Sequence, residues 1–559
     1  MPTINLGKVR FTFQGVYTDA LPYEANDIVN HNGSTYIATS GIAAGPSQEP
    51  LINTSWELFT QGVNDVAITA GDLLYFDGTT LQPLPIGQTG EVLKVNASSL
   101  PEWSLNPVRS STRVLSLPDA KYSFGGLDRG LVQMQDGSLR SWGSGANYQL
   151  GQGLSTANRT YPGYVAFPPN TPLIEPTKFY QDYNSMSGAI DTLGDFWVWG
   201  LNSYGESGTG DSTAQYAPFN VSASVANSLN GKQALHAYTG TDTQAFGSWH
   251  VLATDGTVHS AGYNAYGQLG QGDTTNRNLF NQTPVLSGIT QLAVGSGRYK
   301  HVLALKVDGN TNYVYSWGYA SQGQLGHGNT TQMNIPMQIQ YFNTNSIKIV
   351  EVRASYYSSY ALADNGDLYS WGYNNFGQLG IGDTTQRDTP TLAATDVAEF
   401  FVGRNTQTSL FIKKTNGELH ACGRNAYSML SVDGTATNRP SFGPCSYADS
   451  SFVNADVLKL VVGEYSTYML KTDGTVWSVG YGANGNLGLG TNIEEPYFKQ
   501  VPIHRRFVYD ISIMGSSTSS EGLLMLLDDG QLLMFGNGSS SQSADDDNDI
   551  NYVPNPIIF

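Results

Sequence analysis

The sequence predicts an all-β protein whose larger part is a β-propeller, and three observations support this prediction. One glycine- and aromatic-rich segment recurs eight times along the last four-fifths of the chain. Most copies carry an Asp-Gly or Asn-Gly pair between alternating runs, which is the strongest short signal for a β-hairpin. Glycine accounts for 63 of 559 residues while charged residues make up only 13%, which is typical of a turn-rich chain with a neutral polar surface.

Residues 1–62 lie outside the repeats and contain a hairpin signal of their own, Asn32-Gly33 between the runs DIVNHN and STYIAT. The segment resembles a small chitin-binding-like module, whose pattern is matched by Tyr23, Asp27, Val29, Gly33, Tyr36 and Trp56. The resemblance implies that Tyr23, Tyr36 and Trp56 contact sugar, and the alternative is that they form the core of this small module. We expect residues 1–62 to be the attachment end of the protein.

Residues 63–112 form a glycine- and proline-containing segment between the first module and the repeats. So short a stretch of strand-forming sequence cannot bury a core within one chain, which favours packing between chains. GDLLYFDGTTLQPLPIGQTGEVLKV resembles a segment common in bacteriophage tail-fibre and other virion structural proteins. The resemblance implies a β-rich fibre stalk in a homotrimer.

Residues 113–559 contain the repeats, of which SWGYNNFGQLGIGD (370–383) is one copy. Runs such as IKIVEVRA (347–354) precede each hairpin and others follow the glycine loop, so we expect four strands per repeat and no helix. The equivalent glycines, spaced by 51 to 62 residues, are Gly143, Gly200, Gly262, Gly318, Gly372, Gly423, Gly480 and Gly536. Four-stranded units repeated around an axis make a propeller, whereas a linear solenoid would need capping repeats that neither end supplies. We expect the C-terminal NYVPNPIIF to supply an outer strand to the first unit and close the ring.

This array resembles the regulator of chromosome condensation repeat family, whose signature is an aspartyl-glycine hairpin, a Trp-Gly pair and a Gly-Gln-Leu-Gly loop. DLYSWGYNNFGQLGIGD (367–383) matches that signature nearly throughout. The resemblance implies a propeller, usually with seven blades, whereas the motif count is eight. The sequence therefore predicts seven or eight four-stranded blades. One repeat departs from the pattern, with AYSMLSVDG (426–434) in place of the glycine loop.

Charge and composition exclude several classes of function. The net charge is −18 and no basic patch is visible, so we expect no nucleic-acid partner. No run approaches the roughly 18 apolar residues of a membrane span, so we expect no membrane insertion. The start lacks an apolar signal core, and the protein is expected to be made in the host cytoplasm. Cys422 and Cys445 are the only cysteines, and whether they pair is left open.

Catalytic motifs are also lacking. The family's histidine ahead of the hairpin is matched only by His301, while Ser248, Ser358, Ser409 and Ser466 take its place in four other repeats. The sequence has no nucleophile elbow, no HExxH and no phosphate loop. The acidic run at 545–549 lacks the spacing of a calcium loop. We therefore expect no enzyme activity, no cofactor and no metal, with a depolymerase using an axial carboxylate pair as the alternative.

Aromatic side chains around the glycine loop are the remaining candidates for binding. They recur one and four positions after the equivalent glycine, as Tyr204, Tyr263, Tyr266, Tyr319, Tyr373, Phe376, Tyr427 and Tyr481. One interpretation is packing between blades. The other is a ring of aromatic and amide groups on one propeller face, which would stack on sugars and bond their hydroxyls.

Together these features predict a virion structural protein, a tail fibre or receptor-binding protein whose propeller recognises the host surface. Its partners would be other virion proteins at the N-terminal region and a host glycan or protein at the propeller. A purely structural virion component that docks another viral protein is the alternative.

Overall fold

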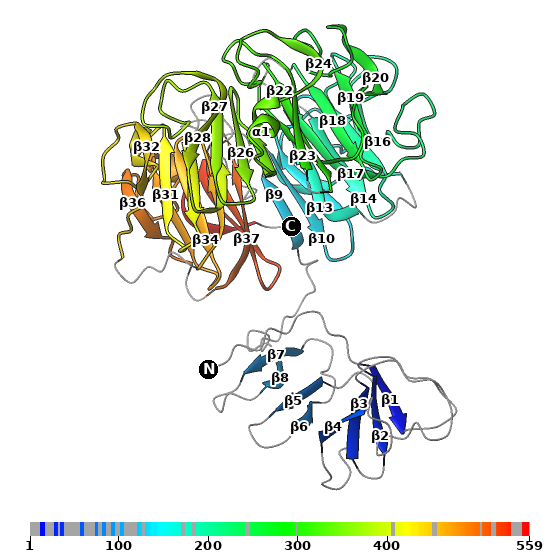
Figure 1. Ribbon diagram of the computed structural model, residues 1–559, viewed down its shortest axis with the longest axis vertical. Helices are drawn as coiled ribbons and strands as arrows, with labels where there is room; N and C mark the ends of the chain where they lie inside the picture. The colour runs from blue at the N-terminus through cyan, green and yellow to red at the C-terminus, as the bar shows by residue number, and fades with distance from the viewer. Residues whose placement is uncertain are drawn as a thin grey trace. The chain divides into compact units, whose positions relative to one another are not determined.

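We analysed a computed structural model of the chain, which separates into two compact units, Met1–Leu115 and Ser116–Phe559 (Figure 1). The structure describes residues 12–16, 27–31, 34–38, 56–60, 73–76, 81–84, 91–95, 101–105, 120–125, 129–168, 174–181, 186–240, 246–297, 299–309, 311–403, 409–449, 456–503, 506–515, 521–537 and 550–557. The predicted boundaries at residues 62 and 112 stay predictions.

The first unit contains one four-stranded sheet and two hairpins. The sheet runs in the order β1 (Thr12–Val16), β2 (Asp27–His31), β3 (Ser34–Ala38), β4 (Trp56–Thr60). The hairpins pair β5 (Leu73–Phe76) with β6 (Leu81–Leu84), and β7 (Glu91–Val95) with β8 (Pro101–Leu105). His31 pairs with Ser34 across antiparallel β2 and β3, which confirms the predicted hairpin around Asn32-Gly33.

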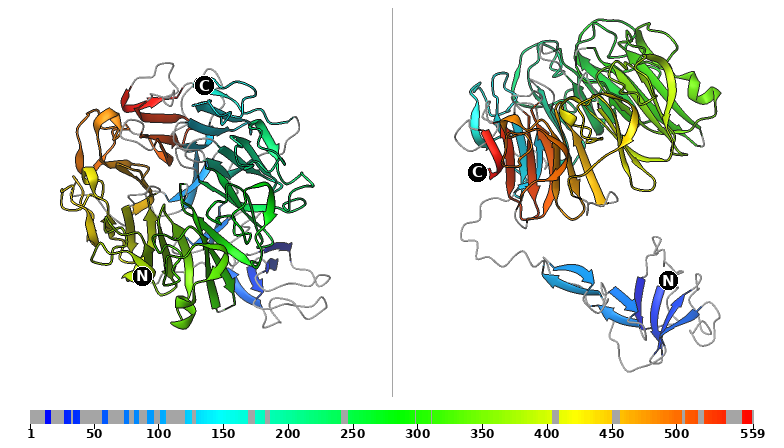
Figure 2. Two further views of the ribbon diagram at one scale, coloured as in Figure 1. Left: turned by 90° about the horizontal axis from the view of Figure 1, so that it is seen from above. Right: turned by 90° about the vertical axis from the view of Figure 1, so that its left-hand side faces the viewer.

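The second unit is an eight-bladed propeller of four-stranded antiparallel sheets, numbered here as blades 1 to 8 in chain order (Figure 2). Blades 1 to 4 consist of β9 (Ala120–Gly125), β10 (Arg129–Met134), β11 (Leu139–Gly143), β12 (Arg159–Tyr164); β13 (Ile174–Gln181), β14 (Met186–Asp191), β15 (Phe196–Gly200), β16 (Gln215–Asn220); β17 (Ala234–Gly240), β18 (Ser248–Ala253), β19 (Val258–Gly262), β20 (Arg277–Gln282); and β21 (Ile289–Val294), β22 (His301–Asp308), β23 (Thr311–Gly318), β24 (Met333–Gln338). Blades 5 to 8 consist of β25 (Ile349–Ala354), β26 (Ser358–Ala363), β27 (Leu368–Gly372), β28 (Arg387–Ala394); β29 (Val397–Val402), β30 (Ser409–Lys414), β31 (Leu419–Gly423), β32 (Arg439–Pro444); β33 (Val457–Val462), β34 (Ser466–Lys471), β35 (Val476–Gly480), β36 (Glu495–Gln500); and β37 (Val508–Met514), β38 (Gly522–Leu527), β39 (Leu532–Asn537), β40 (Ile550–Pro556).

The predicted hairpin joins the second and third strands of a blade. In blade 5 the turn is Asn365-Gly366, where Gly366 has φ +85° and Asn365 Oδ1 accepts the Asp367 N–H at 3.0 Å. Glycine takes this left-handed conformation without steric cost, which explains why the Asn-Gly and Asp-Gly pairs recur. The all-β prediction and the motif count of eight are therefore confirmed, and the usual seven-bladed form does not apply.

The ring closes differently from the prediction. The C-terminal strand β40 pairs with β39 of its own blade, and blade 1 draws all four strands from the consecutive segment 120–164. The expectation that NYVPNPIIF completes blade 1 is wrong. Blade 1 already has its outer strand, β12, which follows its own glycine loop. Blades 1 and 8 meet instead where β9 lies against β37 and β38.

The expectation of no helix is also wrong in detail. A short helix, α1 (Gln340–Thr344), lies between blades 4 and 5, and two 3-10 turns, η1 (Ala426–Ser428) and η3 (Ala483–Gly485), lie in the loops of blades 6 and 7. Phe342 is buried from α1 and packs with the Trp371 ring, 5.8 Å between centroids. The helix therefore fills space between two sheets.

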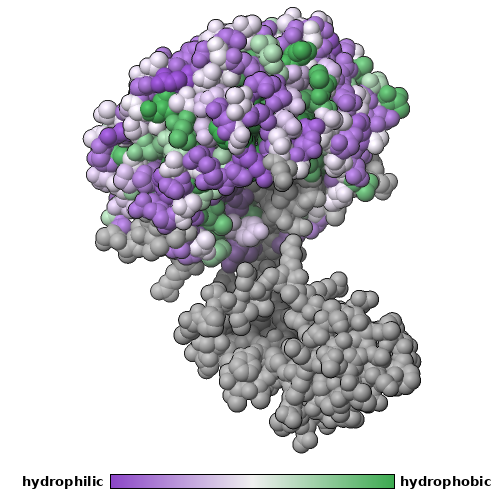
Figure 3. Space-filling model, viewed as in Figure 1, coloured by the Kyte–Doolittle hydropathy of each residue, from purple (hydrophilic) through white to green (hydrophobic). Residues whose placement is uncertain are grey.

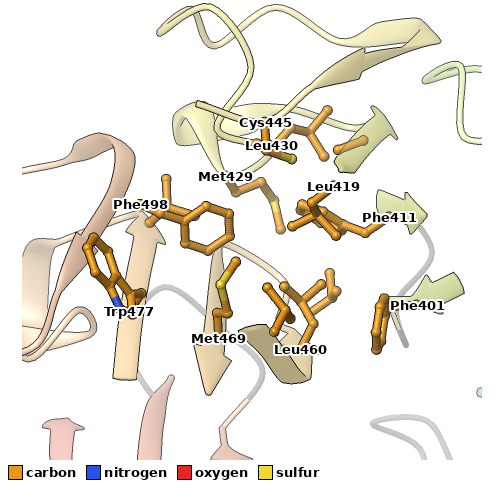
Figure 4. Packing of buried hydrophobic residues seen from close by; sticks show 14 of the residues in the cluster. Phe401, Phe411, Leu419, Met429, Leu430, Cys445, Leu460, Met469, Trp477 and Phe498 are labelled. Atoms are coloured by element: carbon orange, nitrogen blue, oxygen red, sulfur yellow. Dashed lines mark hydrogen bonds between the residues drawn. The ribbon is translucent and has the colours of Figure 1, made fainter. Parts of the chain in front are cut away.

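The core lies between neighbouring sheets. Between blades 6 and 7, Phe411 and Leu419 face Met469, Trp477 and other apolar side chains of the next sheet (Figure 4). The second and third strands of the blades are buried along nearly their whole length, whereas the fourth strands are partly exposed. Burial of two sheet faces per blade is the main stabilisation of the ring.

Candidate functional site

Two kinds of loop meet at one end of every blade. Because the strands are antiparallel, the connection from the first to the second strand and the connection from the third to the fourth lie at the same end. We call the surface they form the loop face. The Asp-Gly and Asn-Gly hairpins lie at the opposite end. The glycine loops and the aromatic candidates of the propeller therefore share one face.

Ten aromatic rings form an unbroken array on the loop face across blades 2 to 5, which we call the aromatic belt. Its members are Tyr204, Phe246, Tyr263, Tyr266, Tyr299, Tyr319, Tyr356, Tyr357, Tyr373 and Phe376. Tyr263 is 7% exposed, and the other nine are half-buried.

The belt crosses from blade to blade through ring contacts. The Tyr204 and Tyr263 centroids are 5.0 Å apart between blades 2 and 3, and the Tyr266 and Tyr319 centroids are 5.2 Å apart between blades 3 and 4. Tyr319 reaches Tyr357 of blade 5 at 6.1 Å. These distances between ring centroids lie in the range at which aromatic rings attract one another. Packing between blades and display on the loop face are thus two roles of the same rings.

In blades 3 and 5, the Gln of the Gly-Gln-Leu-Gly loop fixes a belt position. Gln268 Oε1 accepts the backbone N–H of Tyr266 at 2.9 Å, and Gln378 Oε1 accepts that of Phe376 at 3.0 Å. In blade 2, Glu206 does the same for Tyr204 at 2.8 Å. The Gln or Glu of the loop therefore fixes the backbone of the aromatic residue two positions before it.

The remaining loop residues join neighbouring blades. The Trp371 indole N–H donates to the Gln324 carbonyl of the preceding blade at 2.9 Å, and Trp371 is fully buried. Gly326 has φ +76°, and a Cβ there would lie 2.8 Å from the Trp371 indole nitrogen. The Trp-Gly and Gly-Gln-Leu-Gly motifs are thus the two halves of one contact between blades, which confirms a packing role for Trp371.

A second, smaller aromatic group lies on blades 6 and 7. The Tyr427 and Tyr481 centroids are 4.7 Å apart, and Tyr465 lies 5.7 Å from Tyr427. The Arg424 guanidinium lies 4.9 Å from the Tyr465 ring centroid and donates to the Glu464 carbonyl at 3.2 Å. This group therefore combines rings with charge, unlike the belt.

Four tyrosine hydroxyls converge at the junction of blades 4 and 5. Burial, followed by the neighbouring hydroxyls of Tyr356, Tyr319 and Tyr299, raises the pKa of Tyr357 far above its usual value. Ser321 Oγ donates to the Tyr319 hydroxyl at 2.6 Å. The Tyr357 phenol therefore keeps its proton at physiological pH and is available as a neutral donor and acceptor.

The structure brings together six of the eight propeller candidates in the belt and the other two, Tyr427 and Tyr481, in the second group. Sequence reasoning missed Phe246, Tyr299, Tyr356, Tyr357 and Tyr465, which lie just before the second strand of their blades. The recurring aromatic residue at that place is the signal that would have found them. Tyr23 lies outside the described residues, and of Tyr36 and Trp56 the structure describes only their places in β3 and β4.

The position of the family's histidine has a structural role here. His301 is fully buried, its Nε2 lies 2.8 Å from Ser359 Oγ of the next blade, and burial lowers its pKa to about 3. At the equivalent place, Ser358 Oγ donates to the Tyr373 carbonyl at 2.8 Å and Ser466 Oγ to the Tyr481 carbonyl at 3.2 Å. These side chains hold strands and aromatic loops in place.

One carboxyl pair lies between blades 7 and 8. Glu521 Oε1 accepts the Glu464 N–H at 2.7 Å, and burial raises the Glu521 pKa to about 8. Because Glu521 has no exposed surface, it supports the neighbouring loop rather than facing solvent.

Within the described ranges, no group of three His, Cys, Asp or Glu side chains is placed to hold a metal ion. Cys422 and Cys445 are both buried and free, so they do not form a disulfide.

A cleft of about 700 Å³ lies at the other end of blade 7, beside its hairpin turn, and is lined by Gly474, Val476, Arg506 and Phe507 among others. None of the predicted candidates lines it. In Figure 3, the described propeller surface on the side in view is largely hydrophilic, with small scattered hydrophobic groups. In the part of the chain that the structure describes, no helix is long and apolar enough to cross a membrane.

Comparison with known proteins supports the repeat assignment. Residues 312–362 and 365–405 match the model of the regulator of chromosome condensation repeat, and residues 349–378 match a second model of that repeat. The propeller therefore contains regulator of chromosome condensation repeats within residues 312–405. Over 266 residues it is 27% identical to the ultraviolet-B receptor UVR8 of Arabidopsis thaliana, covering 47% of this chain and 55% of that protein.

The repeat propeller is also 32% identical over 265 residues to the E3 ubiquitin-protein ligase HERC2 of Homo sapiens, covering 46% of this chain and 5% of that protein. It thus spans about half the length of the first relative and a small part of the second. Among solved structures, Prp20p from Saccharomyces cerevisiae superposes with a TM-score of 0.50 at 19% identity, covering 73% of this chain and 92% of that one. This likeness shows the fold alone. The tail-fibre interpretation stays a prediction.

Proposed function

We propose that this repeat propeller is a non-enzymatic virion protein, a bacteriophage tail fibre or receptor-binding protein that recognises the host cell surface through the aromatic belt. The belt carries the proposal: ten half-buried or buried rings, six of them at positions repeated in the sequence motif, share one face of a rigid ring. Half-buried aromatic rings on a rigid scaffold bind with little entropic cost, because they are already ordered.

The virion context rests on the N-terminal segments. Residues 63–112 resemble tail-fibre segments, and residues 1–62 resemble a small chitin-binding-like module. We propose that this region attaches the chain to other virion proteins and that the stalk assembles as a homotrimer. Three propellers on one stalk would turn weak individual contacts into strong overall attachment.

Binding of the labelled full-length chain to bacterial cells tests the proposal. Tyr266→Ala combined with Phe376→Ala removes one ring from each of two belt blades, and Tyr509→Ala is the matched control on β37, because Tyr509 is 56% exposed and lies outside the belt. We expect the double variant to bind the host at least tenfold more weakly and the control to bind as the wild type does. Equal binding by the double variant and the control would refute the role of the belt.

Electron microscopy with an antibody against residues 113–559 tests the virion location separately. Label on a tail or other appendage supports the proposal. Label absent from purified virions that contain the protein would contradict it.

A second candidate is a scaffold that docks another protein rather than a cell surface. Prp20p, which shares the fold, binds Gsp1p and histones, so a propeller of this fold can dock other proteins. Under this candidate, the wild-type chain would bind a purified virion protein in a pull-down and the belt variant would not. The wild-type chain would also fail to bind cells.

A further inference from the structure

The centre of the belt differs from its ends in the number of hydroxyl groups gathered there. The rings of Tyr299, Tyr319 and Tyr357 lie within 6.1 Å of one another, with interplanar angles of 32° to 40°. Tyr356 packs edge-on against Tyr357 at 4.5 Å. We call these four residues the tyrosine cluster. It presents ring faces and phenolic hydroxyls from two blades in one place.

Five of the segments that bring the rings together contain no charged residue. Residues 201–205, 263–267, 319–323, 354–357 and 373–377 contain no Asp, Glu, Lys or Arg. Their exposed tips are Ser203, Ala265, Ser321 and Asn375. The segment of Tyr299 differs, because Arg298 and Lys300 flank that tyrosine. Arg298 lies outside the described residues, and Lys300 is fully buried, with its ammonium donating to Ser248 Oγ at 2.8 Å. The described rings and loop tips therefore offer stacking, hydroxyl and amide groups. The charged side chains of the neighbouring loops in blades 3 and 5, Asp273 and Asp383, are paired with Arg277 and Arg387 at 2.6 Å.

This combination suits one class of ligand. Sugar rings present apolar faces that stack on aromatic side chains and hydroxyls that exchange hydrogen bonds with phenols and amides. A polyanion would need exposed cations, and a chain with net charge −18 would repel it. A long ligand also suits the belt, because the rings continue from blade to blade rather than closing around one pocket.

We infer that the tyrosine cluster binds an uncharged polysaccharide, which lies along the belt from blade 2 to blade 5. This inference rests on the proposed recognition function and names its ligand class. The rings of Tyr299 and Tyr319 stack on sugar faces, and the cluster hydroxyls bond sugar hydroxyls. The second aromatic group, with Arg424 and Glu464, lies beyond the neutral part of the face.

Affinity electrophoresis of the full-length chain tests the ligand class. The gels contain dextran, mannan, galactan or β-glucan as uncharged polymers, and hyaluronate or polygalacturonate as charged ones. We expect at least one uncharged polymer to retard the protein and neither charged polymer to do so. Retardation by no uncharged polymer, or equal retardation by the charged ones, would overturn the inference.

Variants of the cluster locate the binding. Tyr319→Ala removes a ring and a hydroxyl, and we expect the dissociation constant for the retarding polymer to rise about tenfold or more. Tyr319→Phe and Tyr357→Phe keep the rings and remove one hydroxyl each, and we expect a rise of about two- to tenfold. The conservative variants keep the test valid if Tyr319→Ala folds poorly, and Tyr509→Ala remains the control. Unchanged binding by both Phe variants would exclude the hydroxyls from the site.

Cell binding separates failure of this inference from failure of the proposed function. In one outcome, the belt variant loses cell binding, and protease treatment of the cells abolishes binding whereas periodate treatment does not. The receptor is then a protein, so the proposed function stands and the inference about a polysaccharide fails. If cell binding never depends on the belt, the proposed function fails. Periodate-sensitive, protease-resistant binding that depends on the tyrosine cluster supports both.

Discussion

Blades 5 and 6 carry different residues at equivalent places of the loop face. In blade 5 the loop after the third strand turns at Gly377, Gly380 and Gly382, with φ of +78°, +70° and +92°. In blade 6 the same places are held by Ser428, Ser431 and Asp433, with φ of +60°, +55° and +53°. A left-handed residue other than glycine costs roughly 1–2 kcal/mol, so blade 6 keeps the backbone path at an expense that other contacts must offset.

The aromatic and charged groups differ in the same way. Where blade 5 has Tyr373, blade 6 has Arg424, and the unbroken belt ends there. Beyond that point lie Glu464 and Glu521, two carboxyl groups whose pKa burial raises. On the loop face of blades 3 and 5, Asp273 and Asp383 are instead paired with Arg277 and Arg387, each at 2.6 Å. The comparison teaches that neighbour packing sets the backbone path, whereas the side chains divide the face into two sectors. In the neutral sector Asp273 and Asp383 are each paired with an arginine, and the charged sector holds Arg424, Glu464 and Glu521.

The largest expected effect comes from adding one methyl group to the neutral sector. In Gly380→Ala the new Cβ would lie 2.4 Å from a ring carbon of Phe442 and 2.9 Å from Cys422 Sγ of the next blade. We expect the free energy of unfolding to fall by about 3 kcal/mol, from left-handed strain together with overpacking. Urea denaturation followed by tryptophan fluorescence measures it.

Gly382→Ala is the matched control, because it shares the left-handed backbone at φ +92° but its nearest neighbour, Ser441 Oγ, is 3.8 Å away. We expect a loss of only about 1 kcal/mol there. Equal losses in the two variants would show that backbone strain, and not contact with blade 6, requires glycine at position 380.

Glu521→Gln tests the charged sector through pH. The folded pKa of Glu521, about 8, lies above the usual glutamate pKa of 4.5, mainly because of burial. Below pH 4.5 the carboxyl is protonated in both states. As the pH rises towards 8 the unfolded chain releases the proton and the folded protein keeps it, so the free energy of unfolding falls by up to about 1.4 kcal/mol per pH unit.

Gln keeps an acceptor for the Glu464 N–H and cannot ionise. We expect the variant to gain stability relative to the wild type as the pH rises from 4.5 to 8, by at least about 2 kcal/mol. Denaturation midpoints between pH 4.5 and 8.5 measure the difference. If the midpoints of the wild type and the variant changed in parallel over this pH range, Glu521 would not be buried in its protonated state.

The fold of the second unit was largely predictable from residues. The Asn365-Gly366 turn and the Trp371 and Gly380 positions mark local geometry that recurs in chain order, so repeat counting gave eight blades. The role of the C-terminal strand was not predictable, because pairing of β40 with β39 or with blade 1 depends on long-range closure that no local pattern encodes. The site was partly predictable. Tyr266 and Tyr319 follow the motif, whereas Tyr299 and Tyr357 enter from the other connection and join them only in the folded ring.

The smallest expected effect concerns the hydrogen bonds that offset the backbone strain in blade 6. Ser431 Oγ donates to the Ser446 carbonyl at 2.5 Å and accepts the Phe498 N–H of blade 7 at 2.9 Å. Ser431→Gly relieves the left-handed backbone but removes both bonds and leaves a buried N–H without its partner, so we expect a net loss of about 1 kcal/mol. Ser428→Gly is the control, because Ser428 has the same backbone conformation and makes one partly buried bond, to Glu494 at 3.1 Å. We expect denaturant midpoints to fall for Ser431→Gly and to stay or rise for Ser428→Gly. A rise in both would mean that the serines add strain without compensation and that blade 6 is held in its path entirely by its neighbours.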